Sequence, residues 1–308
     1  MRPNRGGRAG ILATLAVLAG VLAVAQFVVP IDRDAEAVLF GRGNVQEQNN
    51  PHNLSKNSMG IHAETETQIC IFCHTPHHAI SDSSLINAPL WNHKLSDATY
   101  VVNSAGDVFS NGVVGTIKLL STPPNRPDGT SRLCLSCHDG TVAIGDVVSR
   151  PEGIIMSADD CLDPDGKLKS TCPSYIGIDL TTKHVVSIPM NKKLIDDSFA
   201  NCTTGGQTTR VRYPFDSGIF NSLPDTVFLR PTGYTYGGNL GVTAGDIDGP
   251  HNLKGYPDGY SYGVQCSTCH DPHYWVDTGD PPDPQKEGYK FLVTGFDALC
   301  NACHKTCP

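Results

Sequence analysis

Apolar residues are most concentrated near the N-terminus of the chain. An uncharged apolar run extends from Ile11 to Val29, three arginines precede it, and the small-residue sequence Ala35-Glu36-Ala37 follows it. This order of a basic segment, an apolar core and a small-x-small site is typical of a cleaved export signal. We therefore predict a signal peptide over residues 1–37. An uncleaved membrane anchor is the alternative, because the run is nearly long enough to span a bilayer.

The remaining chain alternates short apolar stretches with turn residues. Stretches of β-type composition, such as residues 210–213 and 226–230, are interrupted by Gly, Pro and Asn. No long amphipathic helix is evident. The 31 glycines and 22 prolines favour turns, and a hydrophobic content of 39% is low for a self-supporting core. These features predict a mostly irregular chain with short helices and a few short β-strands.

A five-residue motif with the pattern Cys-x-x-Cys-His occurs four times. Two cysteines at this spacing can bond to the two vinyl groups of one porphyrin, and the following histidine then binds the iron. Zinc sites would explain the cysteines but not a histidine after every second one. We predict four covalently bound haems c, with thioether links at Cys70, Cys73, Cys134, Cys137, Cys266, Cys269, Cys300 and Cys303, and proximal iron ligands His74, His138, His270 and His304.

The four haems supply the apolar bodies that the composition lacks, so we expect the chain to pack around a chain of four c-type haems. Short helices should begin at or just before each motif, and Pro76 and Pro272 should end two of them. A Pro-His-Asn-Leu sequence precedes the first and third motifs, which indicates two haem pairs. The predicted segments are a first haem-pair module over 38–139, an insertion with short strands and disulfides over 140–249, and a second module over 250–308.

Four cysteines lie outside the motifs. An even number in an exported chain suggests two disulfides, although three pairings are open. Cys161 with Cys172 would close a short loop, which leaves Cys202 to pair with Cys307. The alternative is that Cys307, next to the C-terminus, stays free or pairs between chains.

Eight further histidines compete for the second axial position of each iron. His77 and His273 each stand three residues after the motif histidine and directly after a proline. This spacing turns each side chain toward a neighbouring haem, so we predict both as distal ligands. His62 is interpreted as a surface residue. The other candidates, whose sequence context leaves their role open, are His52, His78, His93, His184 and His251.

The order of these motifs over most of the chain resembles the tetrahaem cytochromes that polymerise into extracellular nanowires. The resemblance implies bis-His haems in one continuous stack, with one distal histidine donated by a neighbouring subunit, here His52. Val185 departs from the usual proline, His251 is an additional candidate ligand, and the insertion is long. The resemblance rests on Cys70–His77, Ala88–Asn92, Leu133–Ala143, Asp179–His184 and Cys266–His273, and it implies the distal ligands His52, His77, His184 and His273.

The formal net charge of −8 argues against nucleic acid as a partner. We expect an exported electron-transfer protein, not an enzyme, at the cell surface or outside the cell. Its partners would be copies of itself joined head to tail, other redox proteins and extracellular electron acceptors. The alternatives are a monomeric periplasmic, surface or membrane-anchored electron carrier, and a multihaem oxyanion reductase. The reductase would need an iron with an open position, whereas histidines are abundant here.

Overall fold

The structure is a computed structural model, and the chain divides by its internal contacts into residues 1–42 and 43–308. The predicted signal peptide, residues 1–37, lies outside the residues that the structure describes. Within the described ranges no helix is long and apolar enough to cross a membrane. The described residues are 42–85, 90–111, 114–190, 192–204, 207–211, 230–232, 261–276, 292 and 296–308.

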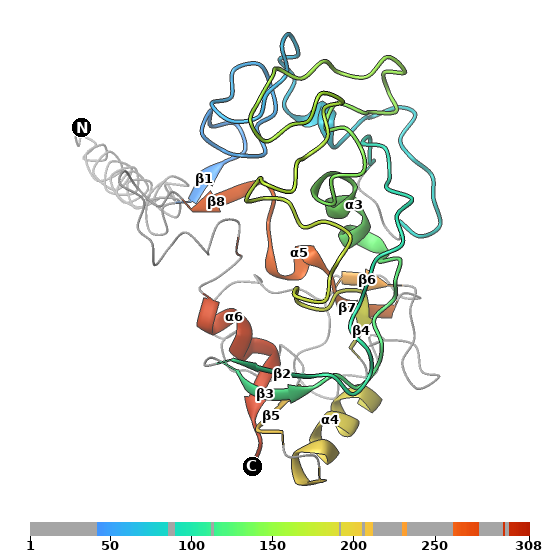
Figure 1. The fold of residues 1–308 in the computed structure, drawn as a ribbon, viewed down its shortest axis with the longest axis vertical. Helices are drawn as coiled ribbons and strands as arrows, with labels where there is room; N and C mark the ends of the chain where they lie inside the picture. The colour runs from blue at the N-terminus through green and yellow to red at the C-terminus, as the bar shows by residue number, and fades with distance from the viewer. Residues whose placement is uncertain are drawn as a thin grey trace, which may run out of the picture. The chain divides into compact units, whose positions relative to one another are not determined.

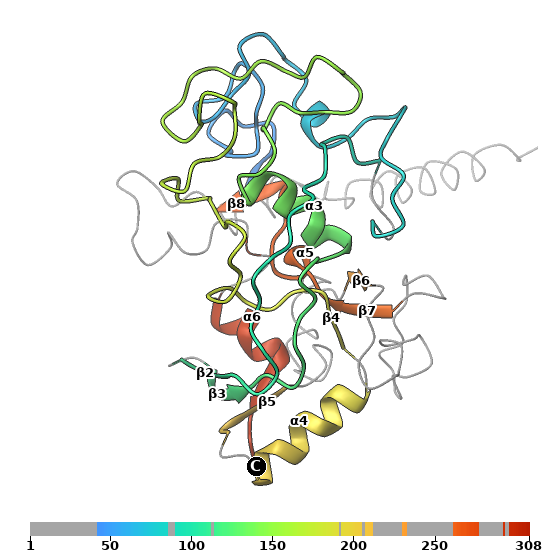
Figure 2. The ribbon, with the colours of Figure 1, turned by 45° about the vertical axis from the view of Figure 1, so that its right-hand side comes forward.

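Most of the described chain consists of turns and loops, with short helices at the motifs (Figure 1). Both cysteines of the second, third and fourth motifs lie in α-helices, and the first motif begins a 3-10 turn, as expected. In both views these elements follow one another along the molecule in the order of the sequence (Figure 2). They are η2 (Cys70–Phe72), α3 (Gly129–His138), α5 (Cys266–Cys269) and α6 (Phe296–Cys303).

One helix was not predicted. Helix α4 (Lys192–Thr204) lies within the segment 140–249, where we expected only strands and loops. Leu194 is buried on one face, while Lys193 and Asp197 form an ion pair of 2.7 Å one turn apart. The Asn201 amide donates to the Asp197 carbonyl oxygen. The apolar stripe is too narrow to signal a helix, so packing against the neighbouring strand stabilises it.

The strands form one hairpin and several short sheets that join distant parts of the chain. β2 (Val108–Asn111) pairs with β3 (Gly115–Lys118), and β1 (Arg42–Asn44) with β8 (Tyr274–Val276). A three-stranded sheet has the order β4-β7-β6, and β5 pairs with β9. Strands from segment 140–249 therefore share sheets with strands from segment 250–308. The bounds of these strands are β4 Ile188–Pro189, β5 Thr209–Val211, β6 Arg230–Thr232, β7 Ser261–Val264 and β9 His304–Thr306.

The predicted strand stretches agree only in part with the structure. Residues 209–211 form β5, whereas residues 212 and 213 lie outside the described residues. Arg230 begins β6, and the rest of the stretch 226–230 is also outside them. In β7 a side chain at Gly263 would place its Cβ 2.2 Å from the Ile188 carbonyl oxygen. A glycine is therefore required for β4 and β7 to approach each other.

The buried apolar residues that the structure describes form small separate clusters. One contains Phe72 of the first motif, and another contains Leu133 of α3 together with Trp91. A third surrounds Leu299 of α6. Because each cluster borders a motif, the arrangement is consistent with the expectation that haems supply the rest of the core, which stays a prediction.

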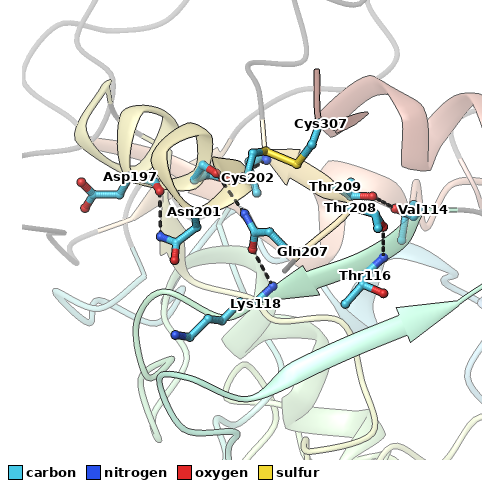
Figure 3. The surroundings of a disulfide bond; sticks show 12 residues. Val114, Thr116, Lys118, Asp197, Asn201, Cys202, Gln207, Thr208, Thr209 and Cys307 are labelled. Atoms are coloured by element: carbon cyan, nitrogen blue, oxygen red, sulfur yellow. Dashed lines mark hydrogen bonds between the residues drawn. A yellow bond between two sulfur atoms is a disulfide. The ribbon is translucent and has the colours of Figure 1, made fainter. Parts of the chain in front are cut away.

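Both predicted disulfides are present. Cys161 and Cys172 have their Cα atoms 5.0 Å apart, and Cys202 and Cys307 have theirs 5.5 Å apart. The second bond connects α4 to the residue that follows β9 (Figure 3). Beside it, the Gln207 amide oxygen accepts from the backbone N–H of Lys118 at 3.0 Å. The bond thus closes a large loop and holds the C-terminus against segment 140–249.

Candidate haem-binding sites

The eight motif cysteines all lie among the described residues, and none of them is in a disulfide. Thiols of consecutive motifs interact with one another. The thiols of Cys134 and Cys266 lie near each other, and their interaction raises the pKa of Cys134 and lowers that of Cys266. At the other two junctions, Cys73 interacts with Cys137 and Cys269 with Cys300. Burial is the main cause that raises the pKa of Cys73 and of Cys269 to about 12, and the thiol of the neighbouring motif adds to the effect.

A buried polar network joins the helices of the second and third motifs. The side chain of Gln265 is fully buried, and its amide oxygen accepts hydrogen bonds from the hydroxyls of Ser131 and Ser187. Its amide nitrogen donates to the Asp128 carboxylate at 2.8 Å. The backbone N–H of Cys266 donates to the Ser131 hydroxyl at 3.0 Å. These contacts set the register between α3 and α5.

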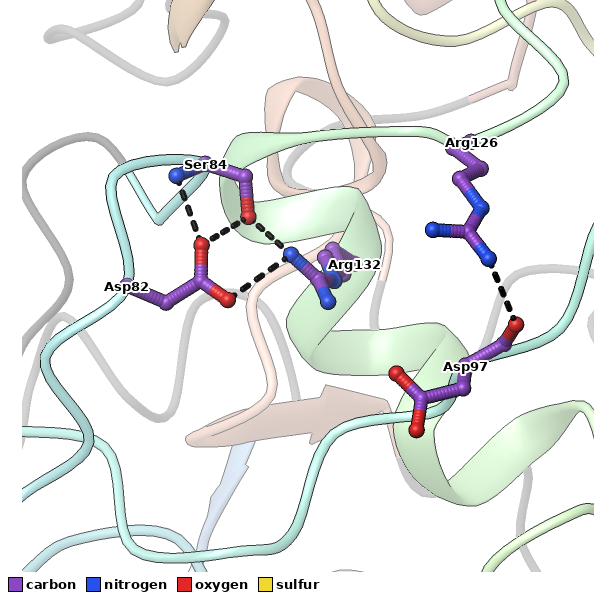
Figure 4. A network of polar contacts seen from close by, with 5 residues as sticks. All are labelled: Asp82, Ser84, Asp97, Arg126 and Arg132. Atoms are coloured by element: carbon purple, nitrogen blue, oxygen red, sulfur yellow. Dashed lines mark hydrogen bonds and ion pairs between the residues drawn. The ribbon is translucent and has the colours of Figure 1, made fainter.

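Arginine side chains hold neighbouring loops near helix α3. Arg132 contacts the Asp82 carboxylate at 3.2 Å and also donates to the Ser84 hydroxyl (Figure 4). Hydrogen bonds from Ser84, more than Arg132, lower the pKa of the Asp82 carboxyl. Arg126, just before the helix, donates to the Asp97 carbonyl oxygen at 3.1 Å. The helix that carries the second motif is thus tied to two segments that precede it in the chain.

Three of the four predicted distal histidines lie opposite a motif histidine. In each pair one residue follows a Cys-x-x-Cys sequence and the other comes from a distant part of the chain. The separations between ring centroids are 6.0 Å for His52 and His138, 6.3 Å for His74 and His273, and 6.2 Å for His184 and His304.

These separations test whether the pairs fit an iron between them. A bond between a metal ion and an imidazole nitrogen is about 2.0 Å long. The nitrogen lies about 1.2 Å from its ring centroid, because ring bonds are about 1.35 Å long. Two imidazoles that bind one ion from opposite sides therefore have centroids about 6.4 Å apart. The three observed separations agree with this value, so the pairs fit the two axial ligands of a haem iron.

The Nδ1 atoms of several paired histidines are held by backbone carbonyl groups. A metal-ligating histidine usually donates its second ring N–H to such a group, which leaves Nε2 for the metal. Burial is the main cause that lowers the pKa of His52 and His304 to about 4, so both rings are neutral, the form that binds a metal. The Nδ1 contacts are His138 with the Ser174 oxygen at 2.8 Å, His52 with Pro272 at 3.0 Å, and His184 with Val185 at 2.8 Å.

Two paired histidines differ from this arrangement. His273 has its Nδ1 atom 3.3 Å from a carboxylate oxygen of Asp271, and this contact raises the pKa of His273. His304 has a buried Nδ1 atom without a hydrogen-bond partner. The electronic character of the ligands is therefore not the same at every pair.

The placement of His52 bears on one expectation. His52 faces His138 of its own chain, and its donation to a neighbouring subunit stays a prediction. His77 instead is exposed, and the Thr75 hydroxyl donates to its carbonyl oxygen at 2.8 Å. Among the predicted distal ligands, only His77 has no motif histidine beside it within the described residues.

The remaining candidates are resolved in part. His93 is 1% exposed, and its two ring nitrogens contact the carbonyl oxygens of Lys94 at 2.8 Å and Ala143 at 3.0 Å. Both nitrogens are occupied, so His93 does not replace a distal ligand. His78 is exposed. His251 lies outside the described residues.

Residues that the sequence did not single out complete the surroundings of the motifs. Asp139, directly after His138, is buried and accepts hydrogen bonds from Thr141 and, at 2.7 Å, from the Tyr100 hydroxyl. Burial, followed by this hydrogen bond, raises the pKa of Tyr100. Trp91 lies edge-on to His74, and its buried Nε1 atom has no hydrogen-bond partner. An aspartate directly follows the motif histidine at position 139 and again at position 271, and this repeat could have identified Asp139 from the sequence. No sequence pattern pointed to Tyr100.

Haem iron takes only two ligands from the protein, because the porphyrin supplies the others. In the part of the chain that the structure describes, no group of three or more His, Cys, Asp or Glu side chains is arranged to hold a metal ion directly. No protein-family model matches the sequence, and no curated protein matches it.

Proposed function

We propose that the protein is a tetrahaem c-type cytochrome that transfers electrons through bis-His haems. The observation that supports this most strongly is the three histidine pairs, each of which combines a motif histidine with a predicted distal histidine at the separation that an iron requires. Bound haem would supply reversible one-electron exchange. At the three paired positions the two imidazoles would hold a haem iron from both sides, so these residues favour electron transfer over binding of an oxyanion substrate.

The contacts between consecutive motifs support a single line of redox sites. The side chains of Cys134 and Cys266 lie near each other, and the other junctions bring together thiols of the first with the second motif and of the third with the fourth. Attached haems would then be neighbours in sequence order. The contribution of the protein is to hold these groups at short range and to surround them with packed chain.

We further propose that protomers join head to tail, with His77 in the role that the resemblance assigns to His52. His77 is exposed and follows its motif through Thr75 and Pro76, so it points a potential iron ligand outward. His52 is already opposite His138 of the same chain. Electrons would then pass from one protomer to the next, to other redox proteins and to extracellular acceptors.

The first experiment measures cofactor content and ligation in the exported, purified protein. Intact mass spectrometry should give the mass of the mature chain plus four haems, and the ferric absorption spectrum of the assembled protein should be low-spin. Fewer than four haems, or bound zinc without a haem spectrum, would refute the proposal. A small anion that shifts the ferric spectrum would favour the oxyanion reductase.

A matched pair of variants separates the two histidine roles. We expect His52→Met to change the low-spin spectrum of isolated protomers, because it replaces an axial ligand within one chain. We expect His77→Met to leave that spectrum unchanged and to reduce filament formation, as seen by electron microscopy of material sheared from cells. Dispersed particles for the unmodified protein at all concentrations would favour the monomeric carrier.

A further inference from the structure

The segment Asp271-Pro272-His273, which directly follows the third motif, contacts the distal ligands of two other motifs. His273 itself lies opposite His74 of the first motif. The carbonyl oxygen of Pro272 lies 3.0 Å from Nδ1 of His52, which is opposite His138 of the second motif. One tripeptide therefore provides the Nδ1 partners for ligands of two neighbouring iron positions.

The two partners are chemically different. His52 faces a neutral carbonyl group, whereas Nδ1 of His273 lies 3.3 Å from a charged carboxylate oxygen of Asp271. The same carboxylate oxygen accepts the backbone N–H of His273 at 3.0 Å, which holds it beside the ring. In the matching position before His77 stands Thr75, which carries no charge. The carboxylate contact thus distinguishes His273 from His52 and His184, whose Nδ1 atoms contact backbone carbonyl oxygens.

A carboxylate that accepts the N–H of a ligating imidazole gives the ring partial imidazolate character, so the ring donates more electron density to the metal. Stronger donation stabilises ferric iron relative to ferrous iron and lowers the reduction potential. A backbone carbonyl has the same direction of effect but a smaller one, because it has no net charge.

Resting on the proposed function, we infer that Asp271 lowers the reduction potential of the iron held by His74 and His273 below that of the neighbouring iron held by His138 and His52. Asp271 is a positioning and tuning residue, since it acts through His273 and not on the iron. Asp139 also follows a motif histidine, but its oxygens accept from Thr141 and Tyr100, so it does not take this role.

The size of the effect follows from exposure. The side chains of Asp271 and His273 are 38% and 58% exposed, so water weakens the interaction. We therefore expect the lower end of the usual range for loss of a ligand's hydrogen-bond partner, about a tenfold change in the ratio of ferrous to ferric iron at fixed potential. For a one-electron couple this equals a shift of about 59 mV.

The test is a redox titration of the four-haem holoprotein carrying Asp271→Asn, followed by electron paramagnetic resonance. The rings of His74 and His273 are nearly parallel, at 18°, whereas the other two pairs are at 82° and 65°. Ferric haems with near-parallel axial imidazoles give a signal distinct from those with near-perpendicular ones, which assigns the potential. The matched control is Asp163→Asn, which removes the same charge from a turn where the carboxylate accepts only backbone N–H groups.

An upward shift of the potential of the near-parallel signal alone, absent from the control, supports the inference. Equal shifts of all signals, an equal shift in the control, or no shift in either variant would overturn it. If the unmodified protein lacks four covalently bound haems, the proposed function fails instead, and that result is visible before any variant is made.

Discussion

The buried amide of Gln265 offers the sharpest test of how the motif helices are held together. Gln265→Met keeps the length of the side chain and removes every hydrogen bond. The Asp128 carboxylate then loses the 2.8 Å bond from the amide, although the Thr232 hydroxyl still donates to it. The hydroxyls of Ser131 and Ser187 lose their shared acceptor. All of these residues are buried, so water does not replace the lost partner.

The expected cost follows from these groups. A buried polar group without its partner costs about 1–3 kcal/mol. Asp128, Ser131 and Ser187 each keep a second partner, so we expect a decrease of about 3–5 kcal/mol in the free energy of unfolding. That is a large share of the roughly 5–15 kcal/mol that stabilises a typical domain.

The measurement is guanidinium denaturation of the holoprotein, followed by the haem absorption band and by circular dichroism. Gln207→Met is the matched control, because Gln207 is also buried but makes its hydrogen bonds to Lys118 and Ser198, away from the motif helices. The control should destabilise the protein by about 1–3 kcal/mol and leave the coupling between haem signals unchanged. A Gln265→Met effect no larger than that of the control would refute the reasoning.

Three further outcomes are expected. Replacing both cysteines of the Cys202–Cys307 disulfide should lower the free energy of unfolding by about 4–5 kcal/mol, and replacing Cys161 and Cys172 by about 3 kcal/mol. The first bond closes a much longer loop, so equal losses in denaturation experiments would contradict this prediction. Arg150→Met leaves the buried Glu66 carboxylate without its cation and should cost about 2–3 kcal/mol, most of which Glu66→Gln in the same chain should restore. Burial lowers the pKa of His93, although its carbonyl partners act in the opposite direction. The folded state therefore binds this proton less readily than the unfolded state, and stability should fall as the pH drops below about 6.5. Melting temperatures of His93→Gln should depend less on pH, and an unchanged pH dependence would exclude His93 as the cause.

Local sequence was sufficient for features that depend on neighbouring residues. The helical turns at the motifs agree with the structure because they involve only neighbouring residues, and a proline two residues after the motif histidine restricts the backbone at the first and third motifs. The disulfide between Cys161 and Cys172 was predictable for the same reason, since few residues separate the two cysteines. Helix α4 was missed because its stability depends on packing and not on its own pattern.

The sequence by itself determined how many Cys-x-x-Cys-His motifs there are, which histidine belongs to each, and which cysteines remain to form disulfides. Only the tertiary structure decided that His52 faces His138, that His273 faces His74, and that Gln265 links two motif helices. The physical reason is the distance along the chain. A Cys-x-x-Cys-His motif is a local arrangement, whereas the paired histidines and the buried amide are brought into position by loops and sheets that join segments far apart in sequence.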